Sequence, residues 1–469
     1  MLTTPIIGLE VHVELKTNSK MFCGCDANHF HVEANTHTCP VCLGLPGALP
    51  VPNKKACEWC IKLGLALGCT INEETFFERK NYFYPDLAKS YQITQLQKPF
   101  AINGHLNIDG HDIRINRAHM EEDTGKSVHI DGSTLLDFNR SGVPLVEIVS
   151  EPDIESAEEA KKYLNKLQQI IRYLGISDAD IEKGSMRCEP TVNVKIEDES
   201  GTYYTPLAEI KNVASLTGVM NAINYEIKRQ IDQYQSDQIA KNSTNKTTRG
   251  WDADKNQTFL QREKEGSADY RYFPEPDIPP IIFSKEQVEE IRKTLPKLPD
   301  EKIAEYKKLG LSNYDASLLA ESKDFSEIFD KIISIDNSPE FAKFTANLLI
   351  GPLRTIEIDI NKISSDYFKK LFDNKSNLSS TATKQLILDS YQSGRDPLDL
   401  AKDQNLFQVS DTSALENFAK EVIEANPKAV EDYRKNPLAI GFLVGQLMKV
   451  SKGSANPQVA KTIFEKILS

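Results

Sequence analysis

Several short segments in the first half of the chain alternate between apolar and polar residues, as in IGLEVHVEL at residues 7–15. A period of two residues is typical of a strand with one buried face. The runs HDIRINRAHM, GVPLVEIV and TVNVKIED read in the same way. Turn signals at Asn103-Gly104, Asp109-Gly110 and Asp131-Gly132 separate segments of this kind. The pattern predicts an N-terminal domain rich in strands.

One clear helix lies among these strands. Ser156 is expected as its N-cap, Glu159 as the partner of Ser156 in a capping box, and Gly175 as its stop. Strands in groups with interspersed helices favour an α+β domain, because a doubly wound parallel sheet needs regular alternation of strands and helices. A buried helix is also expected in KKACEWCIKLGLALGC.

Beyond the proline-rich stretch PEPDIPP at residues 274–280, apolar residues recur with a period near 3.6, as in EKIAEYKKLG and ALENFAKEVIEAN. Asn456-Pro457 is expected to begin the last helix. A break near residues 408–413 divides this helical half. We therefore expect an α+β domain over residues 1–292, an all-α domain over 293–407 and a small all-α tail over 408–469.

Composition describes a soluble globular protein, with 40% hydrophobic and 26% charged residues among 469. The N-terminus lacks a basic start followed by an apolar stretch, and we expect a cytoplasmic protein without membrane insertion. The net charge of −12 argues against a chain that coats nucleic acid indiscriminately. Residues 434–469 nevertheless hold six basic residues and one acidic residue, a charge of +5. This tail is either a site for an anionic partner or a solvated helical face.

Eight cysteines in such a chain suggest metal binding or burial rather than disulfides. Cys23 and Cys25 form a C-x-C pair, and Cys39 and Cys42 form a C-x-x-C pair, which together could close a tetrahedral zinc site. Four small buried residues are the alternative, and one of three nearby histidines could replace a ligand: His29, His31 and His37. Cys57, Cys60, Cys69 and Cys188 are interpreted as packing residues.

The polar face of IGLEVHVEL carries Glu10, His12 and Glu14, which are either wetted surface or part of a metal site. Glu147 lies within the apolar run GVPLVEIV and needs a cation or strong hydrogen bonds to compensate its charge if it is buried. In HMEED, consecutive side chains point to opposite faces, so at most one of Glu121 and Glu122 joins any given face. If these strands are neighbours, three carboxylates and an imidazole converge on a site suited to Mg²⁺ with nucleotide phosphate.

No phosphate-binding glycine loop accompanies these residues. GKS at residues 125–127 lacks the required glycine five positions earlier, where the residue is Met120. The aromatic runs NYFYPDLAKSYQITQ and SADYRYFPEPD are either packed loops or platforms that stack a base beside Lys89 and Arg271. Arg187 and Lys211 place further single cations next to strand-like runs.

Taken in order, IGLEVHVEL, FCGC, CPVCLGLPGALP, RKNYFYPDLAKSYQITQ, HMEEDTGKS, NRSGVPLVEIVSEPD, GSMRCE, EIKN and DYRYFPEPDIPP resemble the B-subunit family of the bacterial aspartyl/glutamyl-tRNA(Asn/Gln) amidotransferases. The end of the chain, through GFLVGQLMKVSKGSANPQV, resembles the YqeY-like tail of that family. The resemblance covers essentially the whole chain.

The resemblance implies an ATP-dependent ligase. The side-chain carboxylate of Glu on tRNA(Gln), or of Asp on tRNA(Asn), would be phosphorylated and then amidated. Ammonia would come from a separate amidase subunit through an internal channel, and a small third subunit would complete a heterotrimer. A non-discriminating aminoacyl-tRNA synthetase is a further candidate partner. The N-terminal domain is expected to be a cradle related in fold to glutamine synthetase, and the +5 tail would contact the tRNA.

The resemblance also assigns residues. The magnesium ligands would be Glu10, His12, Glu122 and Glu147, with Glu121 as a further candidate, and zinc would be held by Cys23, Cys25, Cys39 and Cys42. Lys80 and Lys89 correspond to channel or active-site positions. Arg187, Lys211 and Arg271 are candidates for phosphate contacts of ATP.

Two other functions stay open on the sequence. An ATP-dependent carboxylate-amine ligase acting on a free acid would use the same cradle, but it would give the helical half no task. A non-catalytic, zinc-stabilised RNA-binding scaffold would need the cysteines and the tail but not Glu147.

Overall fold

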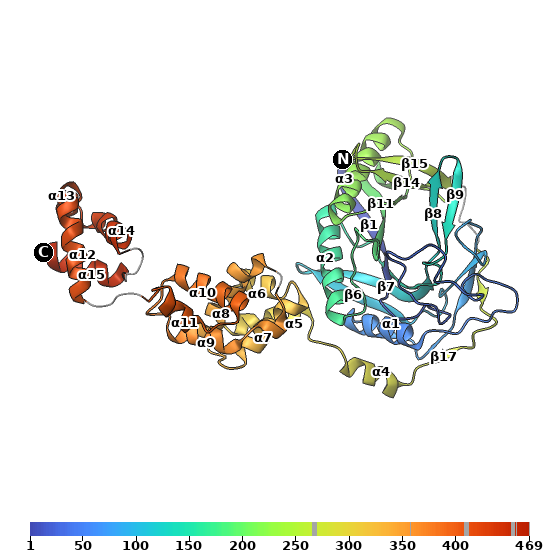
Figure 1. Cartoon of the computed structure of the whole chain (residues 1–469). Coiled ribbons are helices and arrows are strands. Elements are labelled where there is room, and N and C mark those ends of the chain that lie inside the picture. The colour runs from blue at the N-terminus through green and yellow to red at the C-terminus, as the bar shows by residue number, and fades with distance from the viewer. Residues whose placement is uncertain (265–269, 357, 408–411, 452–454, 456, 469) are drawn as a thin grey trace. The chain divides into compact units, whose positions relative to one another are not determined.

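The computed structural model describes all residues except 265–269, 357, 408–411, 452–454, 456 and 469 (Figure 1). The chain forms two compact units, Met1–Leu298 and Pro299–Ser469. In the first unit a large sheet carries helices, and the second unit is helical. An α+β domain followed by helices is therefore confirmed.

A ten-stranded sheet organises the first unit, in the order β15-β14-β13-β11-β1-β10-β7-β6-β2, with β12 paired to β11. The central strand β1 (Leu2–Glu14) pairs antiparallel with β10 and β11. The sheet is mixed, because β13 and β14 are parallel. The other strands are β2 (Thr70–Ile71), β6 (Ala101–Ile108), β7 (His111–Glu122), β10 (Pro144–Ser150), β11 (Met186–Asp198), β12 (Gly201–Tyr204), β13 (Ala208–Lys211), β14 (Lys246–Asp252) and β15 (Gln257–Lys264).

The predicted alternation along β1 is confirmed. Ile7, Leu9, Val11 and Val13 are fully buried in the main core, and they share that core with apolar residues of three helices. These are α1 (Lys54–Ala66), α2 (Ala157–Leu174) and α3 (Leu216–Asp237). Because the helices take up the apolar face, the face that carries Glu10, His12 and Glu14 is left for polar groups.

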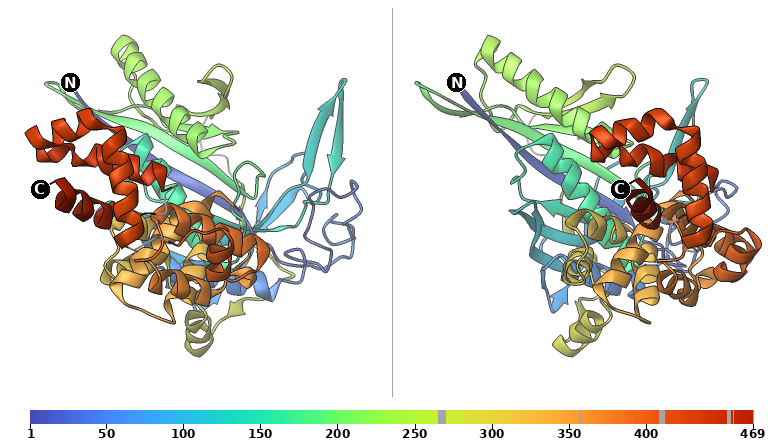
Figure 2. Two further views of the ribbon diagram at one scale, coloured as in Figure 1. Left: turned by 60° about the vertical axis from the view of Figure 1, so that its left-hand side comes forward. Right: turned by 90° about the vertical axis from the view of Figure 1, so that its left-hand side faces the viewer.

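Smaller elements complete the unit. The hairpin of β8 (Lys126–Ile130) and β9 (Ser133–Asp137) projects from the body of the unit (Figure 2). Two short sheets are formed by β16-β4-β5 and β17-β3. Their strands are β3 (Glu74–Thr75), β4 (Glu78–Asn81), β5 (Tyr91–Thr94), β16 (Phe273–Pro274) and β17 (Ile281–Ile282). Helix α4 (Lys285–Lys293) follows β17, and its Val288 and Ile291 pack against the main core.

The predicted helix α2 begins after Ser156, whose side chain accepts a hydrogen bond from the Glu159 backbone N–H, and it ends at Gly175 in the left-handed conformation. The prediction of a capping box between Ser156 and Glu159 is wrong in one detail. Glu159 Oε2 accepts from the backbone N–H of Glu155 at 2.9 Å and not from Ser156. A short reach back to the preceding residue still satisfies a backbone donor at this helix start.

Two of the three turn signals are turns. Asp109-Gly110 joins β6 to β7, and Asp131-Gly132 joins β8 to β9, in both cases with positive φ at both residues. Asn103-Gly104 lies inside β6, where Asn103 has φ 54° and no register partner. The register is the same on both sides of Asn103, with Ile102 opposite Arg117 and Gly104 opposite Ile115, so the strand continues through this dipeptide and does not turn.

The second unit contains two apolar cores. Tyr306, Phe329, Phe341 and Phe368 are buried in the first, and Leu415, Leu443 and Phe464 in the second. Its helices are α5 (Pro299–Lys308), α6 (Asn313–Leu319), α7 (Lys323–Ile333), α8 (Pro339–Ile350), η1 (Pro352–Thr355), η2 (Ile360–Lys362), α9 (Ser365–Asp373), α10 (Ser380–Ser393), α11 (Pro397–Asp403), α12 (Thr412–Ala425), α13 (Pro427–Lys435), η3 (Pro437–Ala439), α14 (Ile440–Val450) and α15 (Pro457–Leu468).

The compact first unit ends at Leu298, because β17 pairs with β3 and α4 packs on the core. The domain boundaries at 292/293 and 407/408 stay predictions. The expected break at 408–413 falls largely outside the described residues, as does the cap Asn456 of α15. Among the helices of the described residues, none combines the length and the apolar character that a membrane crossing requires.

Candidate active site and metal centre

Three neighbouring strands bring the site together on the polar face of the sheet. His12 on β1 lies directly opposite Glu147 on β10, and Glu147 lies opposite His119 on β7. Side chains at paired positions of adjacent strands point to the same face. On the other side of β1, Arg187 of β11 is the register partner of His12. The order β1-β10-β7 is the adjacency that the sequence analysis had to assume.

Two histidines and two carboxylates form the centre of this face. His12 Nε2 lies 3.3 Å from Glu147 Oε2 and 3.7 Å from Glu121 Oε2. His119 Nε2 lies 3.4 Å from Glu121 Oε1 and 3.5 Å from Glu147 Oε2. One ligand atom from each of His12, Glu121 and Glu147 falls within 4.8 Å of the others, a spacing that could hold one metal ion.

The electrostatics of the cluster suit a cation. Burial opposes the charged form of His12, but the hydrogen bond to Glu147 and the charges of Glu147 and Glu121 outweigh it and raise the pKa of His12 to about 9. Burial and the charges of Glu147 and Glu209 raise the pKa of Glu10. Among the described residues, the side-chain carboxylate of Glu10 has no hydrogen-bond donor or ion-pair partner. A divalent cation at this face would relieve the repulsion that Glu10 experiences.

Glu121 and Glu122 point in different directions, as consecutive strand residues must. Glu121 joins His12 and Glu147, whereas the carboxylate of Glu122 binds Lys89 Nζ and accepts a 2.9 Å hydrogen bond from the backbone N–H of Ile93. The structure therefore does not bring Glu122 to the cluster. Glu121 takes the place that the sequence analysis gave first to Glu122.

A cavity of about 640 Å³ lies over the cluster. Its lining includes Glu10 and the cluster itself, together with six basic side chains: Lys80, Arg117, Arg140, Arg187, Lys211 and Lys246. Lys80 Nζ lies 5.2 Å from the ring centroid of Tyr270 and 5.9 Å from that of Tyr82. Lys211 Nζ binds Glu189 and lies 3.1 Å from Glu209 Oε1. A cavity with carboxylates at one place and cations around it can take a metal-bound polyanion.

The aromatic runs contribute to this cavity unevenly. Tyr82 of the first run and Tyr270 and Tyr272 of the second line it. Arg271 is exposed and does not line the cavity, although its two tyrosine neighbours do. Lys89 also lies outside it, paired with Glu122.

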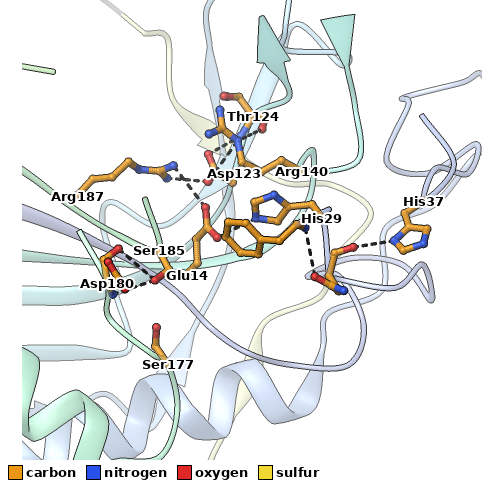
Figure 3. A network of polar contacts seen from close by, with 12 residues as sticks. Glu14, His29, His37, Asp123, Thr124, Arg140, Ser177, Asp180, Ser185 and Arg187 are labelled. Atoms are coloured by element: carbon orange, nitrogen blue, oxygen red, sulfur yellow. Dashed lines mark hydrogen bonds and ion pairs between the residues drawn. The ribbon is translucent and has the colours of Figure 1, made fainter. Parts of the chain in front are cut away.

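Glu14, left unassigned by the sequence analysis, lies in a network at the end of β1 (Figure 3). Its Oε2 lies 2.9 Å from His29 Nε2, and its Oε1 lies 3.5 Å from Arg187 Nη1. Arg187 Nη2 donates to Asp123 Oδ2 at 2.7 Å. Burial opposes ionisation of Asp123, but Arg187 and Arg140 outweigh it and hold the pKa of Asp123 at about 2. Asp123 therefore stays ionised and fixes Arg187 at the cavity wall.

The four predicted cysteines come together as one group. The Sγ atoms of Cys23, Cys25, Cys39 and Cys42 all lie within 4.8 Å of one another, and Cys39 Sγ and Cys42 Sγ are 3.9 Å apart. Four sulfurs bound tetrahedrally at about 2.3 Å from zinc stand roughly 3.8 Å apart. The hydrogen bond with Cys23, together with Lys20, lowers the pKa of Cys42 to about 4, and the same hydrogen bond raises the pKa of Cys23. The group fits zinc.

No histidine belongs to this group among the described residues. His29 binds Glu14, and His37 Nδ1 lies 2.7 Å from the carbonyl oxygen of Asn28. His31 is exposed. Cys57 and Cys60 are buried on helix α1, in agreement with their packing interpretation. Cys69 and Cys188 are buried as well.

Sequence reasoning missed some of these residues. His119 precedes Glu121 by two residues, so the strand period alone would have placed both on one face. Lys20 is fully buried and donates to the carbonyl oxygens of His37 at 2.7 Å and of Phe138 at 3.3 Å. Nothing in its local sequence signals burial. Nor does the local sequence of Arg140 signal that its side chain donates to the backbone of the loop after β7.

Comparisons with known proteins cover almost the whole chain. Residues 5–289 match the GatB/GatE catalytic domain, and residues 327–468 match the GatB domain. The second match begins within the helical unit and runs through the tail. Two matched regions in this order agree with the order of motifs in the sequence.

Curated relatives agree with these matches. The chain is 44% identical over 478 residues to the B subunit of the aspartyl/glutamyl-tRNA(Asn/Gln) amidotransferase of Persephonella marina, with 99% of each chain covered. The B subunit of Thermodesulfovibrio yellowstonii is 43% identical over 475 residues, covering 99% of this chain and 98% of the relative. That of Thermotoga petrophila is 41% identical, with the same coverage. This chain belongs to the family of aspartyl/glutamyl-tRNA(Asn/Gln) amidotransferase B subunits.

Proposed function

We propose that this chain carries the ATP-dependent activation step of a tRNA-dependent amidotransferase. The substrate is Glu attached to tRNA(Gln), Asp attached to tRNA(Asn), or both. The observation that carries the proposal is the cluster of His12, Glu121 and Glu147 beneath a cavity bordered by cations. The names of the relatives supply the tRNA-linked substrates.

The proposed reaction has two steps. An oxygen of the substrate's side-chain carboxylate attacks the γ-phosphorus of ATP, and ADP leaves. Ammonia then attacks the carbon of the acyl phosphate, and inorganic phosphate leaves as the amide forms. The first step brings the carboxylate and the phosphate charges together, and in the second step neutral ammonia loses a proton that leaves with the phosphate. Positioning and electrostatic stabilisation are therefore the main tasks of the protein.

Magnesium is the proposed cofactor of the cluster. Glu10, His12, Glu121 and Glu147 would hold it, and Glu122 would not, because Glu122 binds Lys89. When bound, Mg²⁺ screens the phosphate charges and orients the reacting groups. The oxygen-rich donor set and the negative charges of Glu147 and Glu209 near Glu10 support this cofactor over a softer metal.

The chain's own cations complete the proposed site. Arg187 and Lys211 are fixed by carboxylates at the cavity wall and are suited to contact the phosphates of ATP. Lys80 stands between Tyr82 and Tyr270, and its positive charge interacts with the carboxylates of Glu121 and Glu147. We propose Lys80 as an active-site residue and the Lys89–Glu122 pair as part of a polar path for ammonia. Of the three proposed phosphate contacts, that of the exposed Arg271 has the weakest support.

The remaining parts of the chain serve the assembly in this proposal. A separate amidase subunit supplies ammonia, a small third subunit completes a heterotrimer, and a non-discriminating synthetase hands over the mischarged tRNA. The helical unit and the YqeY-like tail contact the tRNA, the tail through residues 434–469, which hold six basic residues and one acidic residue. The N-terminal domain is a cradle related in fold to glutamine synthetase, and structural zinc closes the cysteine group. Work in protein synthesis implies a cytoplasmic location.

Two competing functions make different predictions. A ligase for a free acid would amidate free glutamate or aspartate. A scaffold without catalysis would leave the output of the complex unchanged when Glu147 is neutralised. The decisive experiment compares amide formation on Glu-tRNA(Gln), Asp-tRNA(Asn) and the free amino acids by the reconstituted complex. Amide formation on tRNA-bound substrate alone, abolished by Glu147→Gln, supports the proposed function.

A further inference from the structure

Glu14 is a buried carboxylate to which the proposed reaction gives no task. Its side chain keeps only 7% of its surface exposed. It lies on the face of β1 that carries Glu10 and His12, yet it does not belong to the His12, Glu121 and Glu147 group. A carboxylate buried this deeply is costly unless polar partners compensate it. The contacts of the Glu14 side chain indicate what it does.

The contacts of Glu14 join two parts of the unit that are far apart in sequence. On one side His29 lies 2.9 Å from its Oε2, and on the other Arg187 lies 3.5 Å from its Oε1 (Figure 3). His29 belongs to the cysteine-closed loop, residues 26–38, which runs between the two cysteine pairs. Arg187 lines the cavity. Glu14 is therefore a direct side-chain link between the loop and the cavity wall.

The loop end of this link is itself fixed. His37 Nδ1 lies 2.7 Å from the carbonyl oxygen of Asn28, next to His29, and buried Lys20 donates to the carbonyl oxygen of His37 at 2.7 Å. Lys20 Nζ also lies 3.7 Å from Cys42 Sγ. The position of His29 is thus tied to the cysteine group.

The cavity end of the link needs a second anchor. Arginine has many rotamers, and a guanidinium that is already in place loses less entropy when a ligand arrives. Asp123 anchors Arg187 Nη2, and Glu14 lies against Nη1. With both anchors, the Arg187 side chain is still 31% exposed, so it stays available to an anion.

We propose that Glu14 is a positioning residue that ties Arg187 to the cysteine-closed loop through His29 and so sets the affinity of the cavity for the phosphate chain of ATP. The inference deepens the proposed function and rests on it. Glu14 touches no reacting atom. Its loss acts on nucleotide binding more than on turnover.

The test is equilibrium binding of Mg²⁺-ATP to the reconstituted complex, together with KM for ATP and kcat. Glu14→Gln keeps the size of the side chain and removes its charge. We expect its Kd and KM for ATP to rise about tenfold, which corresponds to about 1.4 kcal/mol, with kcat changed by less than about twofold. His31→Ala is the matched control, because His31 lies exposed in the same loop, and it should bind ATP like the wild type.

A double-variant cycle tests the link itself. His29→Ala should weaken ATP binding about threefold, and adding it to Glu14→Gln should weaken binding no further, because both act through one contact. Effects that multiply in the double variant would overturn the proposal. Zinc content and melting temperature are measured on every variant. Loss of zinc, or a large drop in melting temperature, in Glu14→Gln would assign Glu14 to stability and also overturn it.

The outcomes separate this inference from the function on which it rests. A wild-type complex that binds no Mg²⁺-ATP would contradict the proposed function, and the inference with it. Equal ATP binding by wild type and Glu14→Gln would overturn the inference alone.

Discussion

His12 and Glu147 face each other across the antiparallel strands β1 and β10, with His12 Nε2 3.3 Å from Glu147 Oε2. The charges of His119 and His12 outweigh burial and lower the pKa of Glu147, so this carboxylate is ionised in an otherwise apolar strand. An ionised carboxylate next to a histidine and a second carboxylate is the central feature of the proposed magnesium site.

Glu147→Gln tests that feature. The amide keeps the shape of the side chain but removes its charge, and we expect ATP-dependent transamidation to fall about 100-fold or more. Binding of the mischarged tRNA, measured by filter retention, should stay within about twofold of the wild type, because phosphate contacts elsewhere carry it. Wild-type transamidation by Glu147→Gln would count against Glu147 as a ligand and in favour of a scaffold.

Glu121 and Glu122 offer a matched pair for the metal assignment. Glu121→Gln should raise the Mg²⁺ concentration needed for half-maximal ATP binding by about tenfold or more, because it removes a ligand. Glu122→Gln should leave this Mg²⁺ requirement unchanged, because Glu122 contacts Lys89 and the backbone of Ile93 instead. The reverse order of effects in a magnesium titration would place Glu122 at the metal.

The cysteine group predicts one zinc ion for each chain. The double variant Cys39→Ser, Cys42→Ser should lose it, because serine does not supply a thiolate. Cys57→Ser is the control, since Cys57 is buried on α1 away from the group. Metal analysis of the purified chains provides the measurement, and undiminished zinc in the double variant would reject the assignment.

Close packing of α1 on the sheet predicts a stability effect at Gly64. An added Cβ would lie 2.5 Å from Ala101 Cβ, so Gly64→Ala should destabilise the first unit by about 1–3 kcal/mol although alanine favours helices. At Gly445 on α14, no atom of the described residues beyond the neighbouring backbone of the same helix lies within 4 Å of such a Cβ. Gly445→Ala should therefore stabilise its helix by about 0.4–1 kcal/mol. Denaturant unfolding followed by circular dichroism checks both, and a stabilised Gly64→Ala would contradict the packing.

The strands that carry the site could be predicted from the sequence better than the set of side chains that meet in it. Alternation along β1 correctly separates Ile7, Leu9 and Val11 from Glu10 and His12, because a half-buried strand enforces a period of two. Alternation alone also limits the choice at HMEED to Glu121 or Glu122. It could not decide between them, because the choice depends on the register that pairs Leu145 with Glu121 and Glu147 with His119.

Long-range pairing explains the other misses. The strands on either side of β1 begin at Pro144 and Met186, and no local pattern names them as its neighbours. Arg187 was a weak candidate until its register with His12 placed it on the site face. Arg271 was an equal candidate, but its side chain is exposed outside the cavity. The link from His29 to Glu14 joins a loop to a strand and has no sequence signal.

A comparison of substrates tests the proposed function in the most direct way. The complex reconstituted with its amidase and small subunits is given ATP, Mg²⁺ and glutamine, together with Glu-tRNA(Gln), Asp-tRNA(Asn), free glutamate or free aspartate. We predict ATP-dependent amide formation on at least one of the aminoacyl-tRNAs and none on the free acids. Amidation of free glutamate or aspartate at a comparable rate would contradict the proposed function.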